Sequence, residues 1–178
     1  STPARSRATT VACTSLRSAI RRFPATSPTA ARSRRGTIGN SGKITATVDT
    51  GISVAGVAAS GKFTGLITNS GTITAYKTGI SIEVVGVSGF SGGISNSGAV
   101  TSTTRTGISV SSVAEGSGAT FSGSILNSGG ITAPDKYGLY IFDGVGGRGG
   151  SFLGSIKSTG NITTYSTGLY IEDVGHKS

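Results

Sequence analysis

The sequence of 178 residues has no tryptophan, no methionine and a single cysteine, Cys13. Residues 36–178 therefore contain no cysteine, which excludes an intrachain disulfide bond or a cysteine-based metal site there. Acidic residues are also scarce, with seven Asp or Glu against sixteen Lys or Arg. No run of about 18 apolar residues occurs, so we expect no transmembrane helix. No signal peptide is visible, and we expect no metal or cofactor.

The composition changes abruptly between residues 35 and 36. Residues 1–35 hold eight of the ten arginines and no acid, whereas all 30 glycines follow residue 35. Residues 36–178 carry eight Lys or Arg against seven Asp or Glu, which leaves a net charge of +1. These differences predict a basic, weakly structured segment over 1–35 and a folded repeat domain over 36–178.

Three origins are open for the basic segment over 1–35. Its Arg-rich, acid-free composition is typical of a nucleic-acid-binding arm or of a targeting peptide. However, Ala-Arg-Ser-Arg occurs at 4–7 and again at 31–34, a step of 27 residues. Residues 24–34 can also be written in codons that encode, in another frame, a box found downstream. We favour a repeat translated out of frame. The folded region lacks a basic stripe, so we expect no nucleic-acid partner.

Three short boxes recur along residues 36–178. The first, Asn-Ser-Gly-x-(Ile/Val)-Thr, has its glycine at positions 42, 71, 98, 129 and, in a degraded copy, 160. The second, Thr-Gly-Ile-Ser-Val, has its glycine at positions 51, 79, 107, 138 and 168. The third contains one phenylalanine per unit. The steps of 27 to 31 residues in the first box are typical of a solenoid, in which each unit buries its apolar face against the next.

Apolar and polar residues alternate strictly inside each unit. Ile52 and Val54, for example, flank Ser53, and the same pattern returns in every later unit. This alternation, rich in β-branched residues, predicts strands, and no segment shows a helical period. We expect three short strands per unit. Corners at Asn-Ser-Gly and Thr-Gly should separate them, since asparagine and glycine tolerate positive φ.

The fixed order of the boxes predicts an all-β fold, a parallel β-helix of about five coils of 27–31 residues. An antiparallel sandwich would also explain short strands, but it would not explain that order. Equivalent residues of successive coils should stack about 4.8 Å apart. Two structural ladders are therefore expected, one of asparagine at a corner and one of phenylalanine inside. Their members are Asn40, Asn69, Asn96 and Asn127, and Phe63, Phe90, Phe121 and Phe152.

The array of Asn-Ser-Gly-x-Ile-Thr, Thr-Gly-Ile-x-Val and Gly-x-Phe-x-Gly boxes resembles the passenger regions of bacterial autotransporters. These are repeat-rich surface proteins and adhesins of Gram-negative bacteria. The resemblance covers essentially all of 36–178. It implies a right-handed β-helix at the outer-membrane surface or secreted, attached to the membrane only through a translocator barrel missing from this sequence. It also implies an adhesive or scaffolding role without catalysis, with a glycan or a host or cell-surface protein as partner.

The last two units differ from the others at their polar positions. Tyr140 and Tyr170 take outward positions that serine fills in earlier units, and Tyr137 lies nearby. Exposed tyrosines can stack on sugar rings, although aromatic packing across strands would equally explain them. We take Tyr137, Tyr140 and Tyr170, together with Asp143 and Asp173, as candidate ligand-binding residues.

Asp143 and Asp173 each lie four residues after a repeat leucine, Leu139 and Leu169. Adjacent coils would place the two carboxylates about 5 Å apart, near the spacing of the pair in a retaining glycosidase. A β-helix polysaccharide hydrolase or lyase is therefore the alternative function. Because few other acids, bases or aromatic residues accompany this pair, we expect a non-catalytic module. Uncapped solenoid ends also predict end-to-end self-association.

Overall fold

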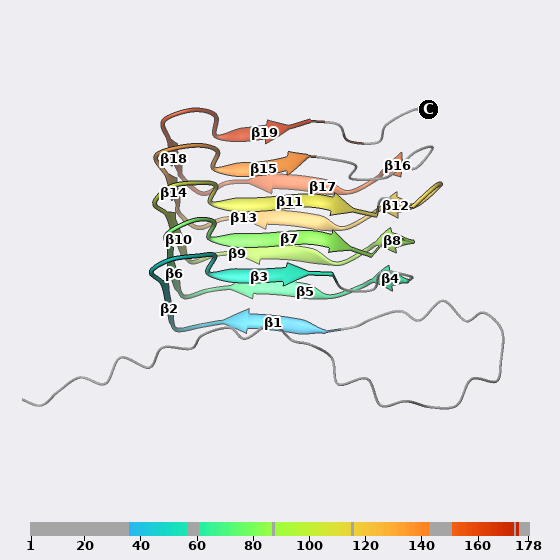
Figure 1. Cartoon of the computed structure of the whole chain (residues 1–178), viewed down its shortest axis with the longest axis horizontal. Coiled ribbons are helices and arrows are strands. Elements are labelled where there is room, and N and C mark those ends of the chain that lie inside the picture. Colours follow the sequence, from blue (N-terminus) through green and yellow to red (C-terminus); the bar gives the residue numbers. More distant parts are fainter. Residues whose placement is uncertain are drawn as a thin grey trace, which may run out of the picture.

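The structure is a computed structural model that describes residues 36–56, 61–86, 88–114, 116–142, 151–172 and 174. These residues form short β-strands and no helix, so no helix in this part of the chain could cross a membrane. Successive units wind into a stack in which equivalent strands lie side by side (Figure 1). Every pair of neighbouring strands is parallel. The predicted all-β parallel solenoid is confirmed.

Four parallel sheets run along the stack. The first sheet contains β1 (Thr37–Asn40), β5 (Leu66–Asn69), β9 (Gly93–Asn96), β13 (Ser124–Asn127) and β17 (Ser155–Ser158). The second contains β2 (Lys43–Ala46), β6 (Thr72–Ala75), β10 (Ala99–Ser102), β14 (Ile131–Ala133) and β18 (Ile162–Thr164). The third contains β3 (Ile52–Ala55), β7 (Ile80–Val85), β11 (Ile108–Val113), β15 (Leu139–Phe142) and β19 (Leu169–Ile171). The fourth contains β4 (Lys62–Phe63), β8 (Gly89–Phe90), β12 (Thr120–Phe121) and β16 (Ser151–Phe152).

The prediction of three strands per coil is wrong, because a full coil has four. The alternating pattern predicts one strand from Phe63 to Asn69, whereas the structure has β4 and β5 with Thr64 and Gly65 between them. The Phe63 ring lies directly over Gly65, where an added Cβ would be 2.2 Å from Cζ of Phe63. The chain bends at this contact, so the phenylalanine box forms short strands of its own.

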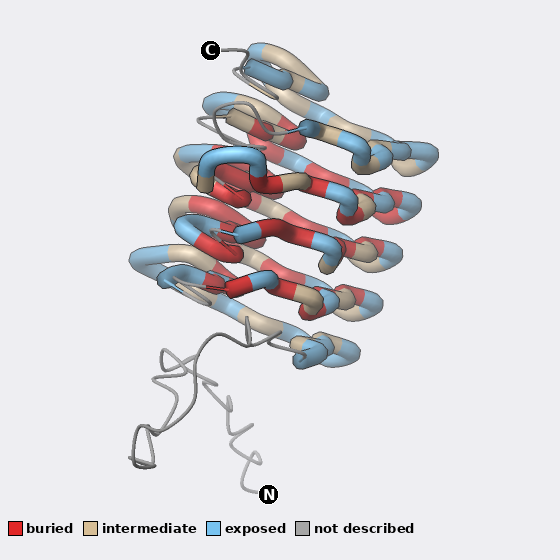
Figure 2. The backbone as a smooth tube through the Cα atoms, turned by 90° about the vertical axis from the view of Figure 1, so that its right-hand side faces the viewer, coloured by how far each residue is buried: buried red, intermediate tan, exposed pale blue. Residues whose placement is uncertain are grey.

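The core is built from the inward side chains of all four sheets. Ile67, Ile73 and Ile82, for example, are each at most 1% exposed. Buried residues concentrate in the middle coils, while the two end coils are mostly exposed or half-buried (Figure 2). Leu169 and Ile171 in the last coil are 44% and 48% exposed. This gradient follows from the architecture, since each coil is covered only by the coils on either side of it.

The four phenylalanines form a continuous stack inside the fourth sheet. Ring centroids are 5.2 Å apart between Phe63 and Phe90, 4.9 Å between Phe90 and Phe121, and 4.8 Å between Phe121 and Phe152. The interplanar angles are 17°, 5° and 5°. These separations are close to the distance between neighbouring strands of a sheet, about 4.8 Å, so each ring packs directly on its equivalent.

The asparagines form a hydrogen-bonded ladder at the corner after the first sheet. The Nδ2 groups of Asn40, Asn69 and Asn96 each donate to Oδ1 of the next asparagine at 2.7 Å. Asn127 ends the ladder by donating to Oγ of Ser158 at 3.0 Å. Asn69, Asn96 and Asn127 are at most 2% exposed. Each inner asparagine side chain therefore accepts a hydrogen bond from one coil and donates one to the next, as buried polar groups require.

The glycine of the Asn-Ser-Gly box is needed for close approach between coils. None of its copies is among the described glycines with positive φ, so the expectation of a positive φ at this corner is wrong. Instead, a Cβ on Gly98 would lie 1.9 Å from the carbonyl oxygen of Gly71 in the preceding coil. The Gly98 amide also donates to the Asn69 carbonyl at 3.0 Å. A side chain here would push the coils apart.

We predict that Gly98→Ala destabilises the fold by about 1–3 kcal/mol through this steric conflict. Gly42→Ala is the matched control, because no atom lies within 4 Å of a Cβ added there. Urea denaturation should show a lower midpoint for Gly98→Ala and an unchanged or slightly higher one for Gly42→Ala. Equal midpoints in the two variants would contradict the close-approach explanation.

We also predict that Asn96→Ala lowers the free energy of unfolding by about 1–3 kcal/mol, because Nδ2 of Asn69 and Oδ1 of Asn127 lose their hydrogen bonds to Asn96 while buried. Asn161→Ala is the control, since the exposed Asn161 side chain lies outside the ladder. Thermal unfolding followed by circular dichroism measures both variants. If both melt at the same temperature, the ladder contributes nothing beyond an ordinary surface asparagine.

Candidate functional site

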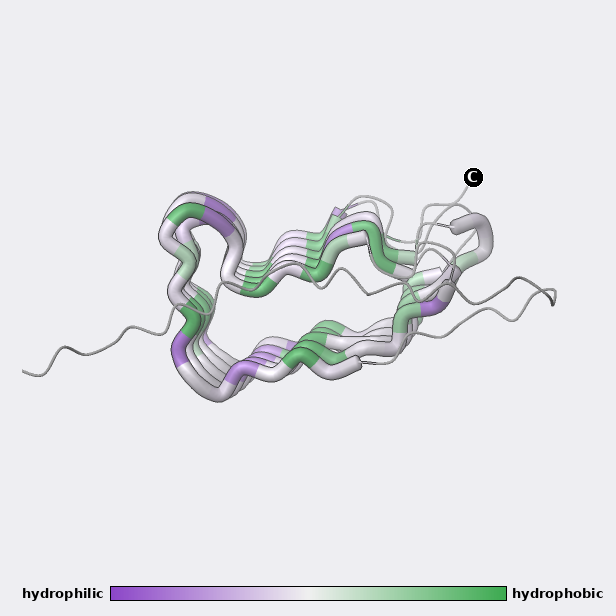
Figure 3. The backbone as a smooth tube through the Cα atoms, turned by 60° about the horizontal axis from the view of Figure 1, so that its bottom comes forward, coloured by the Kyte–Doolittle hydropathy of each residue, from purple (hydrophilic) through white to green (hydrophobic). Residues whose placement is uncertain are grey.

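The corner before each strand of the third sheet bulges away from the coil (Figure 3). Hydrogen bonds to the coil below hold this bulge in place. The Thr104 amide donates to the Tyr76 carbonyl at 2.9 Å. The Arg105 amide donates to Oγ of Ser102 at 3.2 Å, and the Ser102 hydroxyl donates to the Lys77 carbonyl. The bulge thus carries Arg105 at a fixed position beside the outer face of the third sheet.

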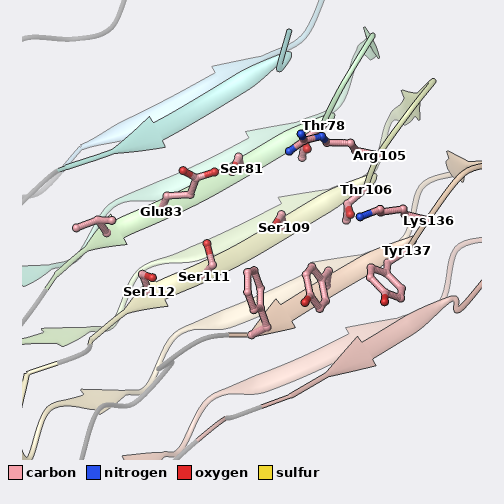
Figure 4. A pocket seen from close by; sticks show the side chains of 13 residues that line it. Thr78, Ser81, Glu83, Arg105, Thr106, Ser109, Ser111, Ser112, Lys136 and Tyr137 are labelled. Carbon is pink, nitrogen blue, oxygen red and sulfur yellow. Dashed lines mark hydrogen bonds between the residues drawn. The ribbon is translucent and has the colours of Figure 1, made fainter.

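A groove of about 530 Å³ lies along that outer face. It is lined by residues of β7, β11 and β15 and of the corners that precede them (Figure 4). Ser81, Ser109 and Ser111 form its floor. Ser81 is 3% exposed and donates to Oε1 of Glu83 at 2.8 Å. Serine side chains are short, so they leave open space beside the larger outward residues of β15.

Aromatic rings form one wall of the groove at β15. Tyr140 pairs in register with Ser109, and Phe142 pairs with Ser111, so the outward side chains become much larger within one coil. The Tyr140 and Phe142 rings are stacked with centroids 4.3 Å apart, and Tyr137 lies 4.6 Å from Tyr140. The cluster of three rings thus forms a continuous apolar wall beside a hydroxyl-lined floor.

Tyr170 extends the aromatic cluster onto the next coil. Its ring centroid lies 4.8 Å from Tyr137 and 5.5 Å from Tyr140. The three predicted tyrosines therefore come together, but Tyr170 lies behind the wall and does not line the groove. The ring faces that turn toward one another pack the last coils together. Tyr137, Tyr140 and Phe142 still line the groove, so part of each ring borders it.

A column of cations lies on the bulge beside the groove. Lys77, Arg105 and Lys136 each precede the glycine of the second box by two residues, in three successive units. In Figure 4, Arg105 extends toward Thr78 and Lys136 toward Thr106. Arg105 and Lys136 are exposed along their side chains and line the groove, whereas Lys77 does not.

Lys77 is the member of this column that has a partner. Its Nζ lies 3.3 Å from Oδ1 of Asp49, which is the only ion pair among the described residues. The hydrogen bond from Lys77, followed by its charge, lowers the pKa of Asp49 below its usual value. Because both side chains are largely exposed, the pair contributes little to stability. It does, however, neutralise the charge of Lys77.

The opposite end of the groove has a strained backbone. Val84 and Ser112 line the groove there and have φ of 50° and 51°. They occupy equivalent positions, since the residues on either side of them pair in register. Positive φ is unfavourable for a β-branched residue such as Val84, and such strain is found most often at functional sites.

The structure describes three of the five candidate ligand-binding residues. Tyr137 and Tyr140 line the groove, while Asp143 and Asp173 lie outside the described residues, so the structure does not place the predicted acid pair. Sequence reasoning missed Phe142, Arg105 and Lys136. The cations could have been found from their constant offset to the second box. Within the described ranges, no cluster of three or more metal-ligating side chains occurs, and no buried side-chain polar atom lacks a partner.

Comparison of the chain with protein-family models, with curated proteins and with solved structures finds no match. The function is therefore argued from the groove and from the repeat architecture that carries it.

Proposed function

We propose that residues 36–178 form a surface-exposed interaction module that binds carbohydrate through the groove of the third sheet and has no catalytic role. The proposal depends on one observation, the position of an aromatic wall beside a floor of serine hydroxyls. Sugars present apolar C–H faces and many hydroxyls, so they favour a surface that offers aromatic rings and hydrogen-bonding groups together.

The size and openness of the groove support this proposal. Its volume of about 530 Å³ lies within the range of about 300–1,000 Å³ that is usual for ligand pockets. The three rings of the wall follow one another along β15 and the corner before it, with centroid separations of 4.6 and 4.3 Å. A row of rings of this length fits several linked sugars better than one.

The solenoid architecture supports a role in display. A stack of coils is rigid along its axis, because each coil is hydrogen-bonded to its neighbours on four sheets. The bulge before each strand of the third sheet projects sideways, while the strands of all four sheets keep their parallel register. In accord with the resemblance to autotransporter passengers, we propose that the module is presented at a bacterial cell surface, as part of a larger adhesin or surface scaffold.

The test of carbohydrate binding is replacement of the wall by the residues of the other units. In Tyr140→Ser combined with Tyr137→Thr, the two changed positions carry the residues of the two preceding units, so the fold should tolerate them. Binding of the full chain to an array of immobilised glycans should fall about tenfold or more, because the aromatic wall of the groove is lost.

Tyr165→Ser is the matched control, because Tyr165 is 90% exposed and lies outside the groove. It should bind glycans as well as the unchanged chain. An array on which the unchanged chain binds no glycan would contradict the proposed ligand class. Shortening of a glycan by the unchanged chain would contradict the non-catalytic role.

A further inference from the structure

Two like charges lie next to each other on the bulge without an ion-pair partner among the described residues. Arg105 and Lys136 occupy equivalent positions in adjacent units, so their backbones are separated by about one strand spacing, roughly 4.8 Å. Parallel stacking of like charges is unfavourable. Lys77, in the same column, forms an ion pair with Asp49 at 3.3 Å. Arg105 and Lys136 form no such pair among the described residues, so their charges can interact with a ligand.

The groove is therefore polarised along its length. Arg105 and Lys136 lie at the end where the strands of the third sheet begin, and Glu83 lies toward the other end (Figure 4). From Thr78, beside Arg105, to Glu83 the chain advances five residues, about 16 Å at strand spacing. Asp135, the acid next to Lys136 in sequence, does not line the groove. An anionic group is thus attracted at one end and repelled at the other.

We propose that the groove binds a short oligosaccharide whose terminal sugar carries a carboxylate, with this carboxylate held between Arg105 and Lys136. The inference rests on the proposed carbohydrate binding and adds the class and orientation of the ligand. A guanidinium group presents two parallel N–H donors to a carboxylate, and a neighbouring ammonium adds a third donor and a second charge. This combination discriminates an acid from a neutral hydroxymethyl group.

The remaining lining residues suit the rest of such a ligand. Thr78 and Thr106 lie beside the two cations and are 9% and 5% exposed, so their hydroxyls are held in place near the terminal sugar. The Tyr140 and Phe142 rings border the sugars that follow. At the far end the Glu83 carboxylate accepts hydrogen bonds from uncharged sugar hydroxyls, but it disfavours a second acidic sugar.

The first experiment compares two trisaccharides that differ only in whether the terminal sugar is glucuronic acid or glucose. Isothermal titration of the full chain should show about tenfold tighter binding of the acidic trisaccharide at low ionic strength. Arg105→Gln combined with Lys136→Gln should remove this preference and leave the neutral trisaccharide bound. Lys77→Gln is the matched control and should keep the preference, because Lys77 belongs to the same column but does not line the groove.

The outcomes separate this inference from the proposed function. Equal binding of both trisaccharides by the unchanged chain would overturn the acidic class while leaving carbohydrate binding intact. Binding of neither trisaccharide would overturn both proposals. If Lys77→Gln also lost the preference for the acidic trisaccharide, the preference would come from the general positive charge of the chain. That result would overturn the proposed carboxylate site at Arg105 and Lys136.

The second experiment tests the orientation through Glu83→Gln. The unchanged chain should bind a trisaccharide of three glucuronic acids several-fold more weakly than one with a single terminal acid, because Glu83 repels the distal carboxylate. Glu83→Gln should bring the two affinities together. A preference for the fully acidic trisaccharide by the unchanged chain would show that the ligand does not lie between the cations and Glu83.

Discussion

In-register parallel stacking is the constraint on which the rest of the structure depends. Each residue lies about 4.8 Å from its equivalent in the next coil. Identical side chains in one column must therefore be able to pack on, or hydrogen-bond to, one another. Asparagine does this by donating Nδ2 to the next Oδ1 at 2.7 Å, and phenylalanine does it by ring stacking at about 5 Å. Where the backbones of successive coils come close, as between Gly71 and Gly98, a Cβ does not fit.

The same constraint converts a small sequence change into a surface feature. A residue that departs from its column creates a step, because the coils on either side keep the ordinary side chain. Tyr140 beside Ser109 and Phe142 beside Ser111 are two such steps on one strand, and together they form a wall. Arg105 and Lys136 add two positive charges on the neighbouring bulge, and both line the same groove. The groove thus lies where the outward residues of the third sheet change from serine in β11 to aromatic residues in β15.

Much of this arrangement could be predicted, because the repeats indicate which residues that are distant in sequence lie next to each other in the fold. The spacing of the boxes predicts which residues meet, since Asn69 can stack on Asn96 only if the chain closes a coil between them. The break between Phe63 and Leu66 could not be predicted, because alternation continues through it and only the packing of the Phe63 ring over Gly65 reveals the bend. Similarly, the packing of Phe142 against Tyr140 could not be predicted, because the equivalent residue in β11 is Ser111 and no repeat pattern indicates an aromatic pair.

The sequence by itself determined the all-β class, the parallel stack and the composition of its ladders, because these depend on periodicity and on pairing between identical boxes. Only the tertiary structure decided that a coil has four strands, that the corner glycines are needed for close approach, and that the bulge carries Arg105 and Lys136 beside an aromatic wall. The physical reason is that these features depend on the path of the chain between the boxes. Hydrogen bonds such as that from the Thr104 amide to the Tyr76 carbonyl define that path, and both of these residues lie outside the three boxes.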